Sequence, residues 1–227
     1  MEKLTLPKPE TINKDEVMRF LGYRSPASPD EIINAKIGQA CDIVLSAITP
    51  RAVYDEFSLE ELETVRLLEG NDIYTHLHGC DRAVLTAVTA GSGVEAKIRA
   101  AQATDALMPV ILDACATAAV ETLCDDFSKM LANTYAHSNL YMTSRFSPGY
   151  GDFPIEKQHI LLRLLDSERK IGLCATQSSI LTPRKSVTAV IGISPSFVKG
   201  KLAGCENCVL REKCDFKRCG FNPAGTK

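Results

Sequence analysis

The sequence predicts an α+β protein: a twisted, mostly antiparallel sheet with long helices packed on it, followed by a small C-terminal cysteine-rich tail that binds metal. Three observations support this prediction. Apolar residues recur with helical spacing over long segments, and short runs rich in β-branched residues lie between turn residues. Four cysteines then crowd into the end of the chain. This mixture indicates a sheet covered by helices, with the cysteines in an appendix of their own.

Composition limits the classes of partner. The chain has 227 residues, of which 45% are apolar and 24% charged, so it can bury the core of one large or two small domains. Its net charge of -2 leaves no basic footprint, and nucleic acid is therefore not expected as a partner. No run approaches the roughly 18 apolar residues of a membrane span, so no membrane association is expected.

The number of cysteines and the N-terminal sequence both favour a cytoplasmic location. The first residues, MEKLTLPKPE, lack the basic-then-apolar pattern of a secretory signal. Nine cysteines are an odd number, which does not suit a complete disulfide framework. We therefore expect a reducing, cytoplasmic environment.

The N-terminal part predicts two helices after a flexible lead-in, residues 1–10. A short helix is expected from Asn13 or Lys14 to Leu21. Ser28-Pro29-Asp30-Glu31 starts a longer one, because it offers a hydroxyl cap, a proline at the first position and acids in the first turn. That helix is expected to carry an inward face made of Ile33, Ile37, Cys41, Val44, Leu45 and Ile48.

The next segments predict most of the sheet. Residues 51–57 and 63–68 are expected to be strands joined by a turn, and 82–90 a third strand after a short helix at 71–78. Gly91-Ser92-Gly93 is expected to be a tight strand-to-helix turn. A phosphate loop is disfavoured there because the G-x-x-x-x-G-K-[ST] pattern is missing.

The remaining elements are predicted from the same periodicities. A short helix at 94–101 and a long one from about Thr104 to Tyr135 come first, and the long helix has an apolar face. The expected elements after it are a strand at 141–146, a helix at 154–168 and strands at 175–181 and 186–194. The predicted domains are thus the lead-in, a body at 11–198, and a linker with its cysteine tail at 199–227.

The tail contains the densest chemical signal. Cys205, Cys208, Cys214 and Cys219 are separated by two, five and four residues. Two thiolates spaced by two residues can curl onto one metal, and a second pair can close its coordination shell. We favour a metal or iron–sulfur site over free or disulfide-bonded thiols. Zinc and a cluster both fit the cysteines, and a three-cysteine site without Cys219 is also possible.

A second signal is the segment Arg145-Phe-Ser147-Pro148-Gly149-Tyr150-Gly151-Asp152. Pro148 fixes its own φ and Gly149 admits a positive φ, so a type II turn with exposed backbone is expected. Arg145 could clamp a carboxylate with two parallel hydrogen bonds. By physical chemistry alone, a ligand loop and an ordinary Pro-Gly turn fit equally well.

The block RFSPGYGDFP, the helix after it and TQSSILTPRKSVTAVIGIS resemble the activation domain of cobalamin-dependent methionine synthase, whose hallmark is R-x-x-P-G-Y. The segments INKDEVMRFLGYR and PRAVYDEF look like short, stand-alone relatives of that domain. The resemblance covers about residues 12–195. It leaves two family features without a counterpart: an acidic residue near the N-terminus and an aromatic segment after the last hairpin.

The resemblance implies a binding site for S-adenosylmethionine. Arg145 would hold the methionyl carboxylate, and Ser147 and Gly149 would supply backbone contacts. Tyr150 would pack near the sulfonium or the adenosine, and Glu121 would meet the cationic or hydroxyl side of the ligand. A zwitterionic sulfonium compound needs such a set of groups: an anion clamp, a carboxylate and close backbone approach.

The implied function is reactivation of a corrinoid methyltransferase by reductive methylation of cob(II)alamin. The cobalamin would lie on the partner or at the interface with it. The implied partner resembles methionine synthase, and a ferredoxin or flavodoxin could donate the electron. An iron–sulfur cluster in the tail would suit this function better than zinc, because it can relay electrons. The alternative is a non-catalytic module that docks on a corrinoid protein and holds a structural zinc.

Overall fold

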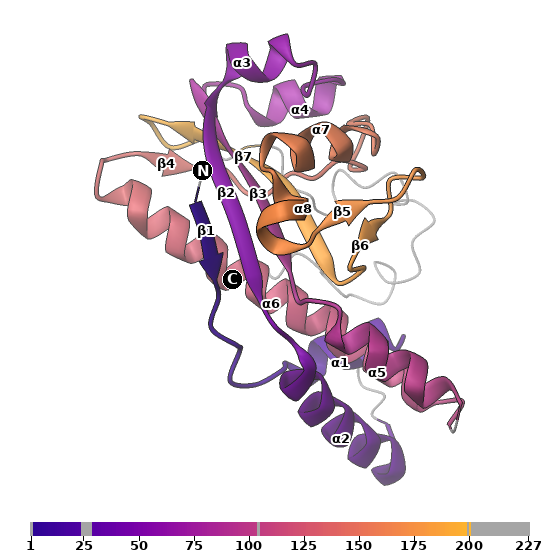
Figure 1. Ribbon diagram of the computed structural model, residues 1–227. Helices are drawn as coiled ribbons and strands as arrows, with labels where there is room; N and C mark the ends of the chain where they lie inside the picture. Colours follow the sequence, from indigo (N-terminus) through magenta and orange to yellow (C-terminus); the bar gives the residue numbers. More distant parts are fainter. Residues whose placement is uncertain (1, 24–28, 104, 199, 201–227) are drawn as a thin grey trace.

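The computed structural model describes residues 2–23, 29–103, 105–198 and 200. Its spine is a five-stranded sheet in the order β1-β2-β3-β7-β4, with every neighbouring pair antiparallel. A separate two-stranded hairpin lies beside it (Figure 1). The strands are β1 (Glu2–Thr5), β2 (Arg51–Ser58), β3 (Arg82–Thr89), β4 (Tyr141–Met142), β5 (Cys174–Ala175), β6 (Leu181–Thr182) and β7 (Ser186–Ser194).

The long strands β3 and β7 are almost wholly buried, and β2 is half-buried, because helices cover both faces of the sheet. Every residue of β3 after Arg82 is buried, which explains its nearly continuous apolar sequence. Alternate residues of β2 point to opposite faces, so Ala52 belongs to one apolar cluster and Val53 to the other. The sheet therefore separates two cores.

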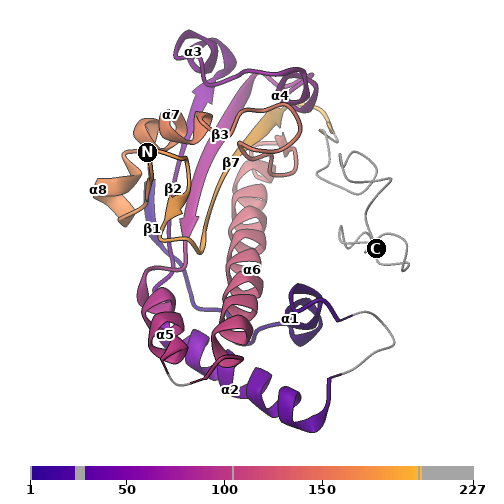
Figure 2. The same cartoon turned by 90° about the vertical axis from the view of Figure 1, so that its right-hand side faces the viewer.

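The first core lies between the sheet and α6 (Met108–Ala136), which runs along one face and continues beyond the end of the sheet (Figure 2). Pro109 in its first turn suits a helix start, since the amide it lacks would have no partner there. Tyr54 and Phe127 meet edge to face with ring centroids 5.8 Å apart. Beyond the sheet, α6 packs against α1 (Lys14–Phe20), α2 (Glu31–Ala47) and α5 (Gly93–Gln102).

The second core is covered by shorter elements on the opposite face. Leu85, Phe153 and Leu161 are among its fully buried members. Figure 1 shows α3 and α4 at one end of the long strands and α7, α8 and the hairpin alongside them. The helices are α3 (Leu59–Thr64), α4 (Asn71–His76), α7 (Lys157–Leu164) and α8 (Ser167–Ile171). In the described part of the chain, no helix combines the length and apolarity that a bilayer crossing demands.

The strand predicted at 63–68 is wrong, because the chain turns into α3 directly after β2. The Ser58 hydroxyl accepts a hydrogen bond from the Glu61 N–H at 3.2 Å, and the Glu61 carboxylate accepts one from the Ser58 N–H at 2.8 Å. This capping box satisfies backbone donors that a helix start leaves without partners. Local capping therefore outweighs the strand-like composition of the segment.

The N-terminus also differs from its prediction. Within the expected flexible lead-in, residues 2–5 form β1, with Leu4 opposite Ala52 of β2. The Tyr54 hydroxyl donates to the Glu2 carboxylate at 2.8 Å. The second helix is capped by Asp30, which accepts from the Ile33 N–H at 2.8 Å, rather than by Ser28, which lies outside the described residues.

Four other predicted elements have different boundaries in the structure. The helix expected at 154–168 is split into α7 and α8 by Asp166, which has a φ of 51°. The strand expected at 175–181 is instead the β5–β6 hairpin. The strand at 141–146 shrinks to β4 and an isolated bridge at Phe146. The long helix begins at Met108 rather than 104, because the Asp105 carboxylate accepts from the N–H groups of Leu107 and Met108.

Candidate functional site at the Arg145 loop

The loop after β4 has the turn that its sequence predicts. The Tyr150 N–H donates to the Ser147 carbonyl at 3.1 Å, and Gly149 has a φ of 95°. A positive φ at the third position is what a type II turn requires. A Cβ atom at Gly149 would lie 2.9 Å from the Ile155 Cδ1 atom, so glycine also provides room.

The loop is fastened to the start of α4. The Asp152 carboxylate accepts hydrogen bonds from the N–H groups of Asn71 and Asp72, each at 2.8 Å. These amides have no partner within the helix, so an acceptor from a distant segment stabilises both the helix start and the loop.

Aromatic rings divide the loop into an inner and an outer side. Phe146 is buried, stacks on His76 with centroids 4.9 Å apart and lies 6.2 Å from the Phe153 ring. Tyr150 lies 6.1 Å from Phe146 but remains 50% exposed. The inner rings hold the backbone, and the phenol of Tyr150 stays available to a ligand.

Arg145 reaches from the loop to the middle of α6. Its Nη2 atom lies 2.8 Å from Asp125 Oδ1 and 3.5 Å from Glu121 Oε2, and its Nη1 donates to Ser128 Oγ at 3.1 Å. These three residues are spaced i, i+4 and i+7, so they share one side of the helix. The guanidinium is mostly shielded, with 24% of the side chain exposed.

Electrostatics at this place are coupled. Partial desolvation raises the pKa of Glu121 above its ordinary value, and the Arg145 charge offsets part of that rise. Desolvation, then the negative charge of Glu121, raises the pKa of Tyr150. Arg145, Glu121 and Tyr150 therefore interact electrostatically with one another. Because its pKa is raised, the Tyr150 phenol is protonated at neutral pH.

Comparison with known proteins identifies the family. Residues 75–199 match the family described as vitamin B12 dependent methionine synthase, activation domain. This span is more than half of the chain and contains α6 and the Arg145 loop. The chain belongs to this activation-domain family. No curated protein sequence matches it.

The fold of this activation-domain chain is also similar to a solved one, the crystal structure of the MetH reactivation domain bound to AdoHcy. The TM-score is 0.56 and the sequence identity 15%; the match covers 97% of this chain and 86% of that chain. The resemblance seen in the sequence is confirmed for the family, and the α+β architecture for the body of the domain.

The structure brings together the site residues that the resemblance implies. Glu121 and Arg145 are in contact range, Ser147 and Gly149 form the turn, and Tyr150 lies beside them. Sequence reasoning missed Asp125 and Ser128, although their helical spacing from Glu121 could have revealed them.

Sequence reasoning also missed the contribution of α1. The charges of Arg19 and Glu16 act on Glu121 and shift its pKa in opposite directions. Glu16 accepts a hydrogen bond from Arg19 Nε at 2.9 Å. An acidic residue from the N-terminal region thus lies close enough for its charge to act on Glu121.

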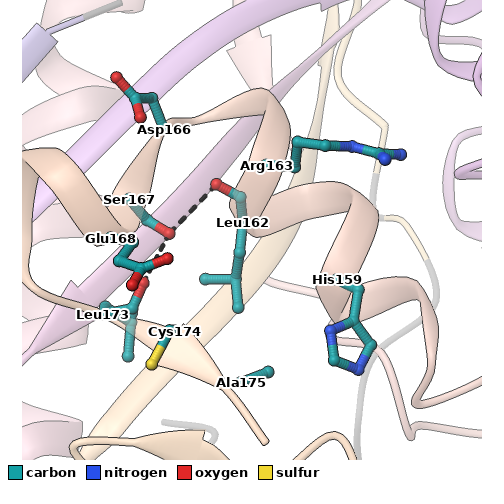
Figure 3. A pocket seen from close by; sticks show the side chains of 9 residues that line it. All are labelled: His159, Leu162, Arg163, Asp166, Ser167, Glu168, Leu173, Cys174 and Ala175. Carbon is teal, nitrogen blue, oxygen red and sulfur yellow. Dashed lines mark hydrogen bonds between the residues drawn. The ribbon is translucent and has the colours of Figure 1, made fainter. Parts of the chain in front are cut away.

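A separate pocket of about 290 Å³ lies between α7, α8 and β5 (Figure 3). The Ser167 hydroxyl bridges the carbonyls of Leu162 and Leu173 at 3.1 and 2.8 Å in its wall. None of the site residues described above lines this pocket, whose lining includes His159, Arg163, Asp166 and Cys174.

The cysteine tail lies outside the described residues, and this includes Cys205, Cys208, Cys214 and Cys219. Within the described ranges, no group of three or more His, Cys, Asp or Glu side chains could hold a metal ion. The metal site therefore stays a prediction from the sequence.

Proposed function

We propose that this activation domain binds S-adenosylmethionine at the Arg145 loop and supports reductive methylation of the corrinoid on a partner methyltransferase. The observation that carries the proposal is the placement of the Arg145 guanidinium between a Pro-Gly turn and the carboxylates of α6. Membership of the family and the AdoHcy bound to the similar MetH domain support it.

Each residue has a role that its chemistry allows. Arg145 holds the methionyl carboxylate through parallel N–H groups, because a guanidinium matches that geometry. The exposed backbone of Ser147 and Gly149 permits close approach, and Tyr150 offers a flat ring. Glu121 faces the cationic or hydroxyl side of the ligand, and the charge of Glu16 from α1 acts on Glu121.

The partner's corrinoid supplies the nucleophile when it is reduced, so this chain needs none of its own. Its residues bind the methyl donor, orient the sulfonium and shield it from water. The site carries more carboxylate than guanidinium charge, since Glu121 and Asp125 both face Arg145. An excess of negative charge suits a ligand with a net positive charge.

The proposal extends to the tail. We expect its cysteines to hold an iron–sulfur cluster that relays an electron from a ferredoxin or flavodoxin, in a cytoplasmic location. The second candidate function is a non-catalytic docking module with a structural zinc. Iron, sulfide and zinc analysis of anaerobically purified protein separates the two, because zinc without sulfide favours the docking module.

The test of the main proposal is methyl transfer. A corrinoid methyltransferase of the methionine synthase type is inactivated to the cob(II)alamin state and mixed with reductant and methyl-labelled S-adenosylmethionine. Wild type should transfer label to the partner's corrinoid, and Arg145→Ala should transfer much less. Arg163→Ala, on exposed α7 surface away from the loop, is the matched control. Equal transfer by Arg145→Ala would refute the assignment of the site.

A further inference from the structure

The guanidinium of Arg145 has an anionic partner within the protein. Its Nη2 atom is shared between Asp125 at 2.8 Å and Glu121 at 3.5 Å, and Nη1 is held by the Ser128 hydroxyl. Nη2 carries two hydrogens and Nε carries one, so a ligand carboxylate can bind the guanidinium through two parallel hydrogen bonds while Asp125 still accepts from Nη2. The Asp125 carboxylate would then lie next to the bound ligand.

Asp125 can move at little cost. Its side chain is 60% exposed, and Arg145 is the partner it has among the described residues. Glu121 lies one turn earlier on α6. If the Asp125 carboxylate shifts on binding, it stays close to the ligand, because Asp125 and the ligand carboxylate contact the same guanidinium.

The charge of the ligand indicates how Asp125 can distinguish the donor from the product. The α-carbon that bears the methionyl carboxylate also bears an ammonium group, so a cation arrives beside Arg145 with the anion. The sulfonium adds a second positive charge, and S-adenosylmethionine carries one net positive charge. When its methyl group leaves, the S–CH₃ bonding electrons stay on sulfur, and the product S-adenosylhomocysteine is neutral overall.

We infer that Asp125 is a specificity-determining residue, whose negative charge beside the ligand makes the site prefer the charged methyl donor over its neutral product. The inference rests on the proposed function. Arg145, Glu121 and Asp125 together carry one net negative charge, which the donor neutralises and the product does not. Loss of the methyl group would thus weaken retention of the product.

The test compares affinities for the two ligands. The dissociation constants of S-adenosylmethionine and S-adenosylhomocysteine are measured by calorimetry for wild type, Asp125→Asn and Asp125→Glu. Asparagine keeps the size and a hydrogen-bond acceptor but removes the charge. We expect the preference for the donor to fall by about threefold in Asp125→Asn, the size of one exposed charge interaction, and to be restored in Asp125→Glu.

Asp126→Asn is the matched control, since Asp126 is the next residue of α6 and pairs instead with Lys129 at 3.1 Å. It should keep the wild-type preference. An unchanged preference in Asp125→Asn would overturn the inference. So would equal tightening of both ligands, because Asp125 would then be a simple competitor of the ligand carboxylate. Wild type that binds neither ligand would overturn the proposed function itself, and the inference with it.

Discussion

Asp72 and Asp152 cap each other across 80 positions of sequence. The Asp152 carboxylate accepts from the Asp72 N–H at 2.8 Å, and the Asp72 carboxylate accepts from the Asp152 N–H at 3.4 Å. The start of α4 and the end of the Arg145 loop are thereby joined. This contact holds the loop in place, with Gly151 packed against the Asp72 side chain.

Gly151→Ala should destabilise the domain by about 1–3 kcal/mol. Gly151 has a φ of 55°, and a Cβ atom there would lie 1.8 Å from Asp72 Oδ2. Gly38→Ala is the control, because Gly38 lies within α2 with no atom near its missing Cβ; it should stabilise by about 0.5–1 kcal/mol. Urea unfolding measures both. Equal stability of Gly151→Ala and wild type would contradict the described packing of the loop.

The capping box of α3 should behave as one unit. Ser58→Ala should lower the free energy of unfolding by about 1 kcal/mol, because it removes the acceptor for the Glu61 N–H. Since the two residues bond each other reciprocally, Ser58→Ala and Glu61→Ala should cost less together than the sum of the single changes. Additive costs in a double-mutant cycle would show that the box does not form.

The Lys36–Asp105 ion pair should give a pH-dependent contribution to stability. The hydrogen bond from Lys36, then the backbone N–H groups of Leu107 and Met108, lower the pKa of Asp105 from 3.8 to about 2. A carboxyl group whose pKa is depressed on folding stabilises above its ordinary pKa and loses this contribution as the pH falls through the folded value.

The difference in unfolding free energy between wild type and Asp105→Asn should therefore be constant near neutral pH and shrink between pH 3.8 and about 2. Asp42→Asn, at an exposed position of α2, controls for general acid effects. A difference that is independent of pH throughout this interval would mean that Asp105 is not held as a carboxylate by Lys36.

Cysteine labelling should follow burial. Among the cysteines of the described residues, Cys174 is partly exposed, whereas Cys41, Cys80, Cys115 and Cys124 are buried. Burial raises the pKa of Cys124 to about 12, which further suppresses its reactive thiolate. Brief iodoacetamide treatment followed by peptide mass spectrometry should find Cys174 labelled first in this set. Early labelling of Cys124 would contradict the packing of α6.

The sequence predicted those parts of the fold that depend on local pattern. The long strands β2, β3 and β7 matched within about a residue, because apolar runs and turn residues mark their ends. Cys41 of α2 contacts Cys115 of α6, at 3.7 Å between sulfurs, which agrees with the apolar face predicted for each of these two helices. The α3 segment failed because a two-residue cap decided its conformation.

Sequence reasoning could predict the local turn of the candidate site but not its long-range contacts. The Pro-Gly turn is local, so Gly149 could be assigned its positive φ in advance. Helical spacing places Asp125 on the same side of α6 as Glu121, but its contact with Arg145 depends on how α6 is rotated against a loop 20 residues later. The pairing of β1 with β2 was missed for the same reason: a long-range contact, rather than local propensity, orders it.

The most direct measurement is anaerobic calorimetric titration of S-adenosylmethionine into wild type and Arg145→Ala. Binding to wild type should weaken by roughly 30-fold or more in Arg145→Ala, because a charge-assisted pair of hydrogen bonds to the ligand carboxylate is lost. Arg163→Ala should bind as wild type does. Undiminished affinity in Arg145→Ala would contradict the account, whether or not the cysteine tail binds a metal.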